Sequence, residues 1–362
     1  MAVMLSAKEL LKPLPYAYGS PEIAGSLRQQ PEYFQVEEIL GFTPGGEGEH
    51  IFLFIEKTEL NTQQVANQLA TIAEIPVRQV SYAGMKDRNA VTRQWFSVHM
   101  PGNKEIDFSS LNGDRLTILK QQRHLKKLRR GVHQGNTFEV ILGDVRNIGK
   151  GNVDGELVDV TARGRFEERI SLLSTEGFPN YFGEQRFGRN GSNLEHVQRW
   201  FAGNFKPKKH EKGLYLSSAR SFLFNRVLAE RVRKNNWNRA TSGELFMLNG
   251  TQSVFPQRQQ DLDARILSGD IHPTGPMYGK SGTLMPEEEL LKLETDILNE
   301  YVSLTEGLER HGLKSERRAL RIMPENLRFE WRGEQIKLTF SLPRGCYATA
   351  LIRELVNYQI AE

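Results

Sequence analysis

The sequence is poor in cysteine, and this scarcity excludes two kinds of stabilising site. Its 362 residues include one cysteine, Cys346, so no disulfide can form within the chain. Zinc sites with several cysteine ligands are excluded for the same reason. The eight histidines are scattered and form no HxH or HExxH group, so we expect no metal site. A reducing compartment, the cytoplasm, is the natural setting for such a chain.

Long apolar segments are also absent. No run approaches the roughly 20 residues that a helix needs to cross a bilayer, so we expect no membrane association. The first residues, MAVMLSAKELLKPLPYAYG, lack a basic start followed by an unbroken apolar segment, and we therefore expect no signal peptide. Hydrophobic residues make up 38% and charged residues 25%, which is typical of a soluble globular protein.

Acidic residues are missing from one stretch of the chain. Between Asp114 and Glu139 there is none, although the net charge is only +4. This basic run contains Arg115, Lys120, Arg123, Lys126, Lys127, Arg129 and Arg130, with His124 and His133 beside them. A second basic cluster, KPKKHEK, spans 206–212. A solvated face can explain either cluster alone, but so many cations without a counter-acid favour a polyanionic partner, most simply a nucleic acid backbone.

The first half of the chain reads as strands with few helices. Strands are predicted at 31–39, 51–57, 95–100, 115–120 and 136–142, and one amphipathic helix at 61–75. In the first strand, Phe34, Val36 and Glu38 share one face. Asn61 and Gln64 supply a capping pattern for the helix.

From about residue 156 to 310 the pattern becomes mostly helical. Helices are predicted at 192–201, 218–232 and 286–301, the first with a Ser192–Glu195 capping box and the last with Pro286 in its first turn. A hairpin at 327–340 and a helix at 348–360 follow. Since chains beyond about 250–300 residues usually divide, this order predicts an α+β fold with one domain inserted in another.

The stretch AGMKDRNA, residues 83–90, places Asp87 between Lys86 and Arg88. Gly84 permits a tight backbone conformation, and two cations would help to keep a buried carboxylate ionised. Neighbours on a strand point to opposite faces, however, so neither cation need touch the acid. Taken alone, the stretch is best explained as a turn acid at the entrance to a strand.

RRGVHQGNTFEV, residues 129–140, joins the basic run to a strand. Asn136 offers both a donor and an acceptor, so it can read a nucleobase edge. Phe138 can stack on a base, although a core aromatic in a strand is the commoner explanation.

Three further stretches have unusual composition. NYFGEQRFGRNGSN, residues 180–193, combines aromatics with Arg186 and Arg189 among glycines, which predicts a loop for stacking and phosphate contacts. HPTGPMYG, residues 272–279, predicts an ordered loop with either a structural or a contact role. In LPRGCYATALIREL, residues 342–355, Tyr347 follows the turn at Gly345, where it either faces a pocket or packs at the helix start.

Together these motifs resemble the TruD family of tRNA pseudouridine synthases, which modify uridine 13 of tRNA. The resemblance rests on PEYFQVEEI, AGMKDRNAVTRQWFSV, GNTFEV, NYFGEQRFG, HPTGPMYG and LPRGCYATALIREL, in this order, and runs from about residue 20 to the C-terminus. It implies a pseudouridine-synthase-type mixed, largely antiparallel sheet core with a mainly helical insertion domain. The expected boundaries are 1–158 and 312–362 for the split catalytic domain and 159–311 for the insertion.

The resemblance also implies roles for single residues. The aspartate of the GxKD motif is catalytic, here Asp87, while Phe34, Asn136 and the aromatic residue after the LPxG turn, here Tyr347, line the uridine pocket. Other members carry Phe at the last position, and the added hydroxyl leaves the ring face for stacking. The cation that keeps Asp87 ionised is left open among Lys86, Arg88 and Arg28. We add Phe138 to the pocket and expect RNA backbone contacts from Arg123, Lys126, Lys127, Arg129, Arg130, Arg186 and Arg189.

The implied reaction explains why few residues suffice. Uridine becomes pseudouridine by isomerisation, so neither a redox cofactor nor ATP is required. One ionised carboxylate can attack C1′ as a nucleophile or remove the 2′ proton, and the sequence leaves both open. The base must leave the tRNA stack, and aromatic stacking with an Asn136 hydrogen bond would offset that cost. Nothing in the sequence demands more than a monomer.

Two other classes of function compete with this interpretation. A non-catalytic RNA-binding protein or RNA chaperone on the same fold would have the same electrostatics, but it has no use for an acid in a pocket that faces phosphates. A ribonuclease would need histidine pairs or a carboxylate-bound metal, and the scattered histidines argue against it.

Overall fold

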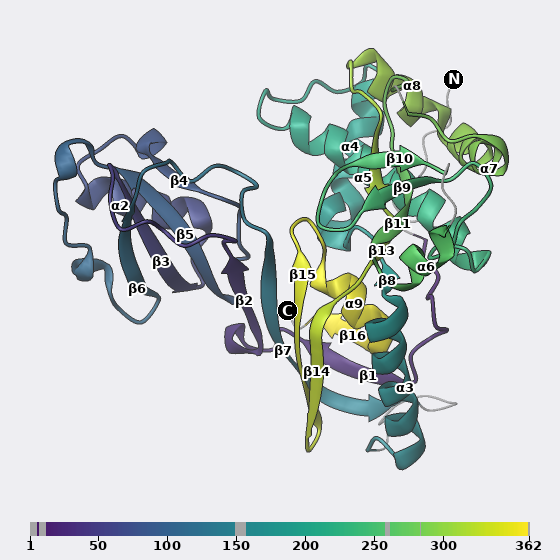
Figure 1. Cartoon of the computed structure of the whole chain (residues 1–362), viewed down its shortest axis with the longest axis horizontal. Coiled ribbons are helices and arrows are strands. Elements are labelled where there is room, and N and C mark those ends of the chain that lie inside the picture. Colours follow the sequence, from purple (N-terminus) through teal and green to yellow (C-terminus); the bar gives the residue numbers. More distant parts are fainter. Residues whose placement is uncertain (1–5, 7–11, 149–156, 258–260, 283, 361–362) are drawn as a thin grey trace. The chain divides into compact units, whose positions relative to one another are not determined.

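A computed structural model describes residues 6, 12–148, 157–257, 261–282 and 284–360 (Figure 1). The chain divides into two compact units. The sheet unit takes its described residues from 22–170, 324–345 and 356–360, and the helical unit takes them from 6–21, 171–323 and 346–355. The predicted domain boundaries after residues 158 and 311 stay a prediction.

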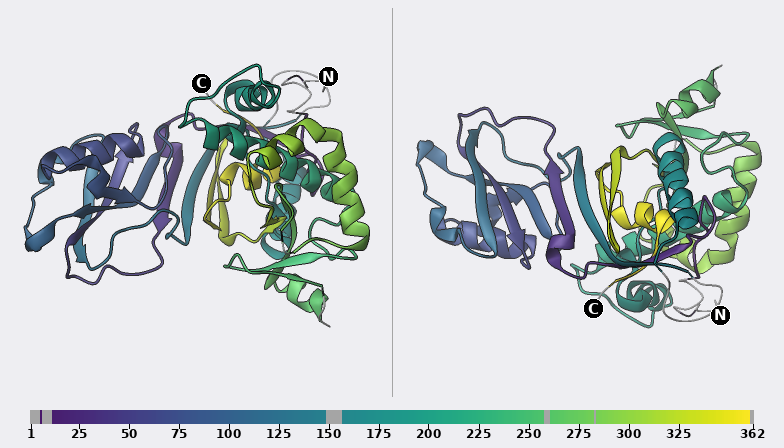
Figure 2. Two further views of the ribbon diagram at one scale, coloured as in Figure 1. Left: turned by 90° about the horizontal axis from the view of Figure 1, so that it is seen from above. Right: turned by 90° about the horizontal axis from the view of Figure 1, so that it is seen from below.

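The sheet unit is built on strands in the order β14-β15-β7-β2-β5-β3-β6, with β1 paired to β7 and β16, and β4 paired to β5 (Figures 1 and 2). Only β1–β16 and β2–β5 pair in parallel among these described strands. The predicted mixed, largely antiparallel α+β class is therefore confirmed. The strands are β1 Ile23–Leu27, β2 Phe34–Ile39, β3 His50–Thr58, β4 Val80–Tyr82, β5 Val91–His99, β6 Leu116–His124, β7 Gly135–Asn147, β14 Glu325–Arg332, β15 Gln335–Pro343 and β16 Asn357–Ile360.

Helix α2, Thr62–Ile72, covers one face of the central strands of this sheet. Alternate residues of β3, among them Leu53 and Ile55, pack against Val65 and Leu69 of the helix. The intervening β3 residues, such as Phe52, form a second cluster on the opposite face. The strand predicted at 51–57 is therefore confirmed, and its continuous apolar run is explained by burial of both of its faces.

The start of α2 confirms the capping prediction. The Asn61 side chain accepts a hydrogen bond from the Gln64 backbone amide at 2.8 Å, and the Gln64 side chain accepts one from the Asn61 amide at 2.9 Å. These reciprocal bonds satisfy two donors that a helix N-terminus leaves free.

The C-terminal segments join the same sheet. The predicted hairpin is confirmed by β14 and β15, but the prediction of a helix to residue 360 was wrong. Helix α9, Ala348–Leu355, ends early, and residues 357–360 form β16 beside β1. Likewise the strand predicted at 31–39 begins only at Phe34, after a 3₁₀ turn at Pro31–Tyr33. Tyr358 and Ile360 fit a two-residue period as well as a helical one, so periodicity did not distinguish them.

The helical unit surrounds α5, Lys212–Arg233, whose Phe222, Leu223 and Val227 are buried. Its other helices are α4 Ser192–Phe201, α6 Leu262–Leu267, α7 Glu288–Leu298, α8 Val302–Arg310 and α9, while α3 Val160–Glu176 spans the boundary between the units. The unit also holds a sheet in the order β10-β9-β11-β12 and a short pair β8–β13. These strands are β8 Phe178–Pro179, β9 Leu245–Leu248, β10 Val254–Pro256, β11 Ile271–Met277, β12 Glu316–Ala319 and β13 Arg321–Ile322.

Three local predictions in this unit were wrong. Ser192 is the first residue of α4, and the capping position is Gly191, whose φ of +78° suits a glycine. Pro286 precedes the capping residue Glu287 of α7 instead of lying in the first turn. HPTGPMYG is not a loop, because residues 271–277 form β11. That strand pairs with β9 through 271–273 and with β12 through 274–277, so its prolines avoid a position between two ladders.

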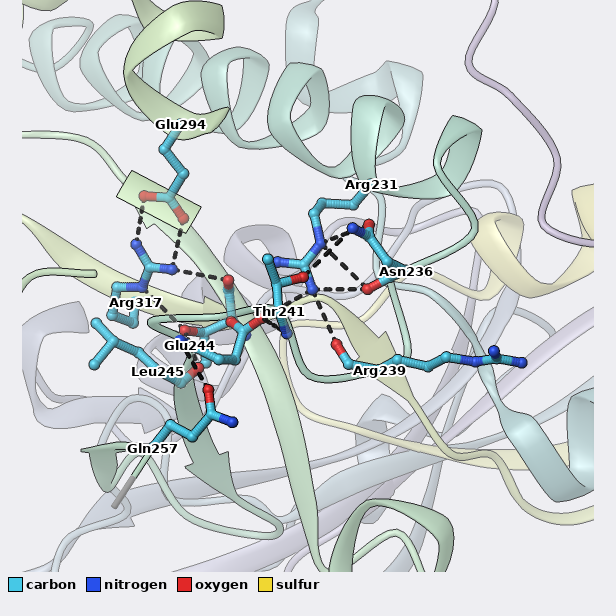
Figure 3. Close-up of polar contacts among 10 residues, drawn as sticks. Arg231, Asn236, Arg239, Thr241, Glu244, Leu245, Gln257, Glu294 and Arg317 are labelled. Atoms are coloured by element: carbon cyan, nitrogen blue, oxygen red, sulfur yellow. Dashed lines mark hydrogen bonds and ion pairs between the residues drawn. The ribbon is translucent and has the colours of Figure 1, made fainter. Parts of the chain in front are cut away.

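Buried ion pairs join α5 to the residue before β9 and β12 to α7 (Figure 3). Arg231 donates to the Glu244 carboxylate at 2.8 Å, and both side chains are 0% exposed. The same guanidinium donates to the carbonyls of Asn236 and Arg239 at 2.7 and 3.0 Å. Burial raises the pKa of the Glu244 carboxyl even with Arg231 beside it. The pair therefore fixes the geometry of the unit more than it adds net stability.

Removing one partner should be costly. We expect Arg231→Met to lower the free energy of unfolding of the helical unit by about 3–5 kcal/mol, because Glu244 is left as an uncompensated buried charge. Arg233→Met removes an exposed pair with Glu230 on the same helix and should change it by less than about 0.5 kcal/mol. Urea denaturation followed by tryptophan fluorescence measures both, and equal stabilities of the two variants would contradict the expectation.

Candidate active site

Two neighbouring strands of the sheet unit present most of the predicted pocket residues on one face. In β2, Phe34, Val36 and Glu38 are buried and alternate with less buried residues, which confirms that they share a face. In the antiparallel pair with β7, Val36 lies opposite Phe138 and Glu38 lies opposite Asn136. Directly opposite residues point to the same side, so all five side chains lie on one face of the sheet.

The aromatic rings of this face are packed against one another. Phe34 contacts Phe138 edge to face with centroids 6.2 Å apart, and Phe138 stacks on Phe340 of β15 at 5.3 Å. Asn136 differs, because its Oδ1 atom is buried and accepts no hydrogen bond within the described structure. A buried acceptor without a partner is unusual, and it is suited to a donor on a bound ligand.

Asp87 lies in the loop between β4 and β5, and its carboxylate meets one cation. Arg28 Nη2 donates to Asp87 Oδ2 at 2.6 Å. The same guanidinium lies 4.1 Å from the centroid of the Phe34 ring. Arg28 follows β1 with a φ of +64°, a conformation that a non-glycine residue adopts at some cost. This unusual backbone places the carboxylate, the cation and the ring in one cluster.

The other two candidate cations are engaged elsewhere. Lys86 Nζ donates to Glu38 Oε2 at 2.8 Å, and the two side chains are only 6% and 0% exposed. Arg88 donates to the main-chain oxygen of Glu59 at 3.2 Å. Of the three candidates that the sequence left open, the structure therefore places Arg28 on the carboxylate.

A closed set of hydrogen bonds fixes the loop 83–90. The Thr62 hydroxyl at the start of α2 accepts from the Lys86 amide at 2.9 Å and donates to Gln94 Oε1 at 2.9 Å. The Gln94 amide donates to the carbonyl of Gly84 at 3.1 Å. Thr62 and Gln94 are fully buried, so these bonds do not compete with water. They attach the loop to α2 through Thr62 and to β5 through Gln94.

Lys57 of β3 is a buried residue that the sequence analysis missed. Its ammonium donates to the main-chain oxygens of Leu60 and Asp87 at 2.6 and 2.9 Å. Burial lowers the pKa of Lys57 to about 8. The sequence carried a signal for this position, because Lys57 continues the core-facing alternation of Leu53 and Ile55.

His133 is a second buried residue, although the sequence placed it only beside the basic run. Its ring explains the need for Gly84, because a Cβ there would lie 3.3 Å from His133 Cε1. Burial lowers the pKa of His133, with Glu38 opposing the shift and Lys86 and Arg344 adding to it. The imidazole is therefore neutral at neutral pH, beside the ion pair that anchors the loop.

The basic run separates into structural and exposed cations. Arg123 donates to the carbonyls of Gly48 and Lys104 at 2.9 and 2.6 Å, so its guanidinium supports the fold. The remaining predicted RNA contacts of this run are exposed, and they are Lys126, Lys127, Arg129 and Arg130. The segment that carries them is fixed to the loop of Asp87 by the amide of Gly131, which donates to the carbonyl of Ala83 at 2.7 Å.

The segment 180–193 of the helical unit is not the aromatic binding loop that its composition suggested. Tyr181, Phe182 and Phe187 are 2%, 6% and 4% exposed, so the prediction that these rings are a stacking surface was wrong. Arg186 donates to the hydroxyls of two serines of α5, Ser217 and Ser221. Its neighbour Arg189 is exposed and remains available for an RNA contact.

Tyr347 lies at the start of α9 in the helical unit and is half-buried. Its ring meets Phe182 edge to face at 5.9 Å, and the guanidinium of Arg318 lies 4.1 Å from the centroid of Phe182. A Cβ on Gly183 would lie 3.1 Å from Tyr347 Cδ1. The buried NYFG segment thus supports the Tyr347 ring.

The described residues offer neither a metal site nor a membrane-spanning helix. They contain no group of three or more His, Cys, Asp or Glu residues that could hold a metal ion. Among the helices within the described ranges, none is long and apolar enough to cross a membrane.

Comparison with known proteins gives consistent matches along almost the whole chain. The family pattern described as tRNA pseudouridine synthase D (TruD) matches residues 12–205 and 205–355. The protein named tRNA pseudouridine synthase D of Hydrogenovibrio crunogenus is 40% identical over 350 residues, covering 96% of this chain and 97% of that protein. The protein of the same name from Colwellia psychrerythraea is 42% identical over 356 residues, covering 95% and 93%.

A solved structure shares the fold. The crystal structure described as a tRNA pseudouridine synthase D from Methanosarcina mazei matches with a TM-score of 0.72 at 20% sequence identity, covering 96% of this chain and 97% of that chain. At that identity the match shows the fold alone.

The hydroxyl of Thr62 should set the stability of the loop 83–90. We expect Thr62→Val to lower the free energy that protects the Lys86 amide from hydrogen exchange by about 1–3 kcal/mol, because buried partners lose their hydrogen bonds. Thr62→Ser retains the hydroxyl and should retain most of the protection. Unchanged exchange of the Lys86 amide in Thr62→Val would show that the network does not hold the loop.

Proposed function

The chain belongs to the tRNA pseudouridine synthase D (TruD) family, and from this premise we propose that it isomerises uridine 13 in the D arm of tRNA, with Asp87 as the reacting carboxylate. The observation that carries the proposal is the cluster of Asp87, Arg28 and Phe34. A partnered, half-exposed carboxylate beside an aromatic ring fits a site that must keep an acid ionised next to a nucleobase.

The proposed reaction conserves all atoms of the nucleoside. The N1–C1′ bond breaks, the uracil ring turns, and C5 bonds to C1′. The hydrogen on C5 leaves as a proton, and N1 gains a proton. Because nothing is oxidised and no group is added, a positioned carboxylate can serve either as the nucleophile at C1′ or as the base for the 2′ proton. Arg28 supports both roles, since its guanidinium donates to Asp87 Oδ2 at 2.6 Å and so positions the carboxylate.

We assign the edge of the uracil ring to Asn136, and on the family resemblance alone we keep Tyr347 as a residue for stacking. The buried Oδ1 of Asn136 lacks a partner, and N3–H of uracil is a donor of the required kind. Tyr347 supplies a half-buried ring for stacking. Phe34 is only 2% exposed and lies under Arg28, so we assign it to the floor of the pocket, with Phe138 behind it.

The wider assignments follow the same premise. We infer that Lys126, Lys127, Arg129, Arg130 and Arg189 contact the tRNA backbone, that Lys86 and Arg28 position the site, and that residues 159–311 form an inserted domain. Recognition of this kind depends on RNA shape and phosphate charge more than on sequence. We further propose a cytoplasmic monomer that works without a cofactor.

Replacement of Asp87 separates catalysis from binding. We expect Asp87→Asn to lower kcat by at least about 10²–10⁴-fold, because the amide is neither a base nor a nucleophile, while tRNA affinity stays within about twofold of wild type. Asp114→Asn changes an exposed acid of the same unit and should leave both unchanged. Unmodified transcripts are incubated without cofactor or metal, and pseudouridine is mapped by carbodiimide primer extension. Binding by both proteins with pseudouridine from neither would favour an RNA chaperone.

The exposed cations should act on affinity alone. We expect the triple variant Lys126→Gln, Lys127→Gln, Arg129→Gln to bind tRNA more weakly, with the slope of log K against log salt reduced by about 0.7–0.9 for each lost phosphate contact. Its kcat at saturating tRNA should equal that of wild type. A control that changes Lys234, Arg239 and Lys292, exposed cations of the helical unit outside both basic clusters, should retain the slope. If the slope of log K against log salt is the same in both variants, the basic run does not contact the tRNA backbone.

A further inference from the structure

We propose that Lys57 is a positioning residue for Asp87, whose buried ammonium fixes the main chain of the catalytic aspartate and holds a positive charge on the protein side of its carboxylate. This inference rests on the proposed function of Asp87. It assigns to β3 a part in the reaction, although Lys57 itself is fully buried and does not touch the substrate.

The position of Lys57 in the sheet is that of a core residue. It is 0% exposed, and its strand partners are Thr92 on β5 and Leu116 on β6, neither of which is charged. Its side chain lies on the face of β3 that Ile55 shares with the apolar core under α2. Packing alone would favour an apolar residue there, because removing an ammonium from water is costly.

The contacts of the ammonium show what it does at this place. It donates to the carbonyl of Leu60 at 2.6 Å and to the carbonyl of Asp87 at 2.9 Å. The first contact holds the turn that leads into α2, and the second holds the residue whose side chain is proposed to react. Lys57 therefore joins three segments of the sheet unit at one charged atom, and charge-assisted bonds of this kind are stronger than neutral ones.

Other side chains hold the loop but not the main chain of Asp87. Gln94 binds the carbonyl of Gly84, and Thr62 binds the amide of Lys86. Within the described structure, the hydrogen bond to the Asp87 carbonyl comes from Lys57. Without this bond, no side chain would hold the main chain of Asp87 in the described structure, and its carboxylate would be less well positioned.

Lys57 and Arg28 divide the support of Asp87 between them. Arg28 meets the carboxylate itself and retains some exposure, at 17% of its side chain, so substrate can rearrange that contact. Lys57 is covered on all sides and keeps its charge in place. Two charged groups act on it, since Asp87 raises the pKa of Lys57 and Lys86 lowers it, while burial, the largest influence, brings it to about 8. Lys57 is thus largely ionised at neutral pH.

The test compares Lys57→Met and Lys57→Arg with wild type and Asp87→Asn in full-length protein. Methionine keeps the length of the side chain without charge or donors, and arginine restores both. Ile55→Val is the matched control, because it perturbs the same face of the same strand without touching a charge. The substrate is a tRNA transcript with tritium at C5 of uridine, since bond formation at C5 releases that hydrogen to water. Affinity for tRNA and the thermal midpoint are measured for each variant.

The positioning role makes three linked expectations. Lys57→Met lowers kcat by about 10–100-fold, the usual effect of misplacing a reacting group, while tRNA affinity stays within about twofold. Lys57→Arg recovers at least part of that loss. Wild-type kcat falls as the pH rises through about 8, because Lys57 loses its charge there. This fall is absent from Lys57→Arg, because a guanidinium stays ionised. Any titration of the substrate affects both proteins equally.

Each contrary result identifies a different failure. Wild-type kcat in Lys57→Met, with Asp87→Asn inactive, would overturn the inference and leave the proposed function intact. Identical losses of kcat in Lys57→Met and Ile55→Val would assign Lys57 to stability alone. If Lys57→Met does not fold, the pH dependence of kcat provides the test. A decrease of kcat above pH about 8 in Lys57→Arg as well as in wild type would overturn the inference. No tritium release from wild type would reject the proposed function itself.

Discussion

The geometry around Asp87 depends on charges that the sheet unit holds away from water. Lys86 and Glu38 form an ion pair with side chains 6% and 0% exposed, and such pairs seldom add much net stability. Their effect is selective, because any other position of the loop 83–90 would leave a buried ammonium or carboxylate without a partner. Glu38 lies on the face that also carries Asn136 and Phe138. One constraint therefore orders both the acid-bearing loop and the strand residues beside it.

The helical unit applies the same constraint with a different cation. Two of its buried cations are guanidinium groups, those of Arg231 and Arg317, and each binds a carboxylate and at least one main-chain oxygen (Figure 3). The planar fork of arginine suits this purpose, because several donors point to fixed places at once. In the sheet unit a single lysine nitrogen binds two carbonyls. Arg231 and Arg317 thus join a carboxylate to main-chain oxygens, whereas Lys57 joins two main-chain oxygens alone.

Much of this arrangement was predictable where one local rule decides. Alternation placed Phe34 and Glu38 on one face, and the capping rule found the start of α2. At the candidate site, the misses occurred where composition does not reveal burial. The rings of 180–193 read as an RNA surface, yet Phe182 is internal because the Asn225 side chain bonds both its amide and its carbonyl. Lys57 had a detectable signal in the alternation of β3, but only the folded chain shows that its partner is the Asp87 carbonyl.

The pairing of β7 with β15 has a consequence for how the enzyme is made. The hydroxyls of Thr137 and Ser341 are 2.9 Å apart, although 204 residues separate them in the chain. A ribosome adding about 5–20 residues per second takes roughly 10–40 s to cover that interval. Throughout it, the β7 edge that carries Asn136 and Phe138 has no β15 to pair with and is open to wrong partners. The face of β7 that carries Asn136 and Phe138 is thus completed only when the last strands emerge, so a nascent chain contains Asp87 long before β15 can pair with β7.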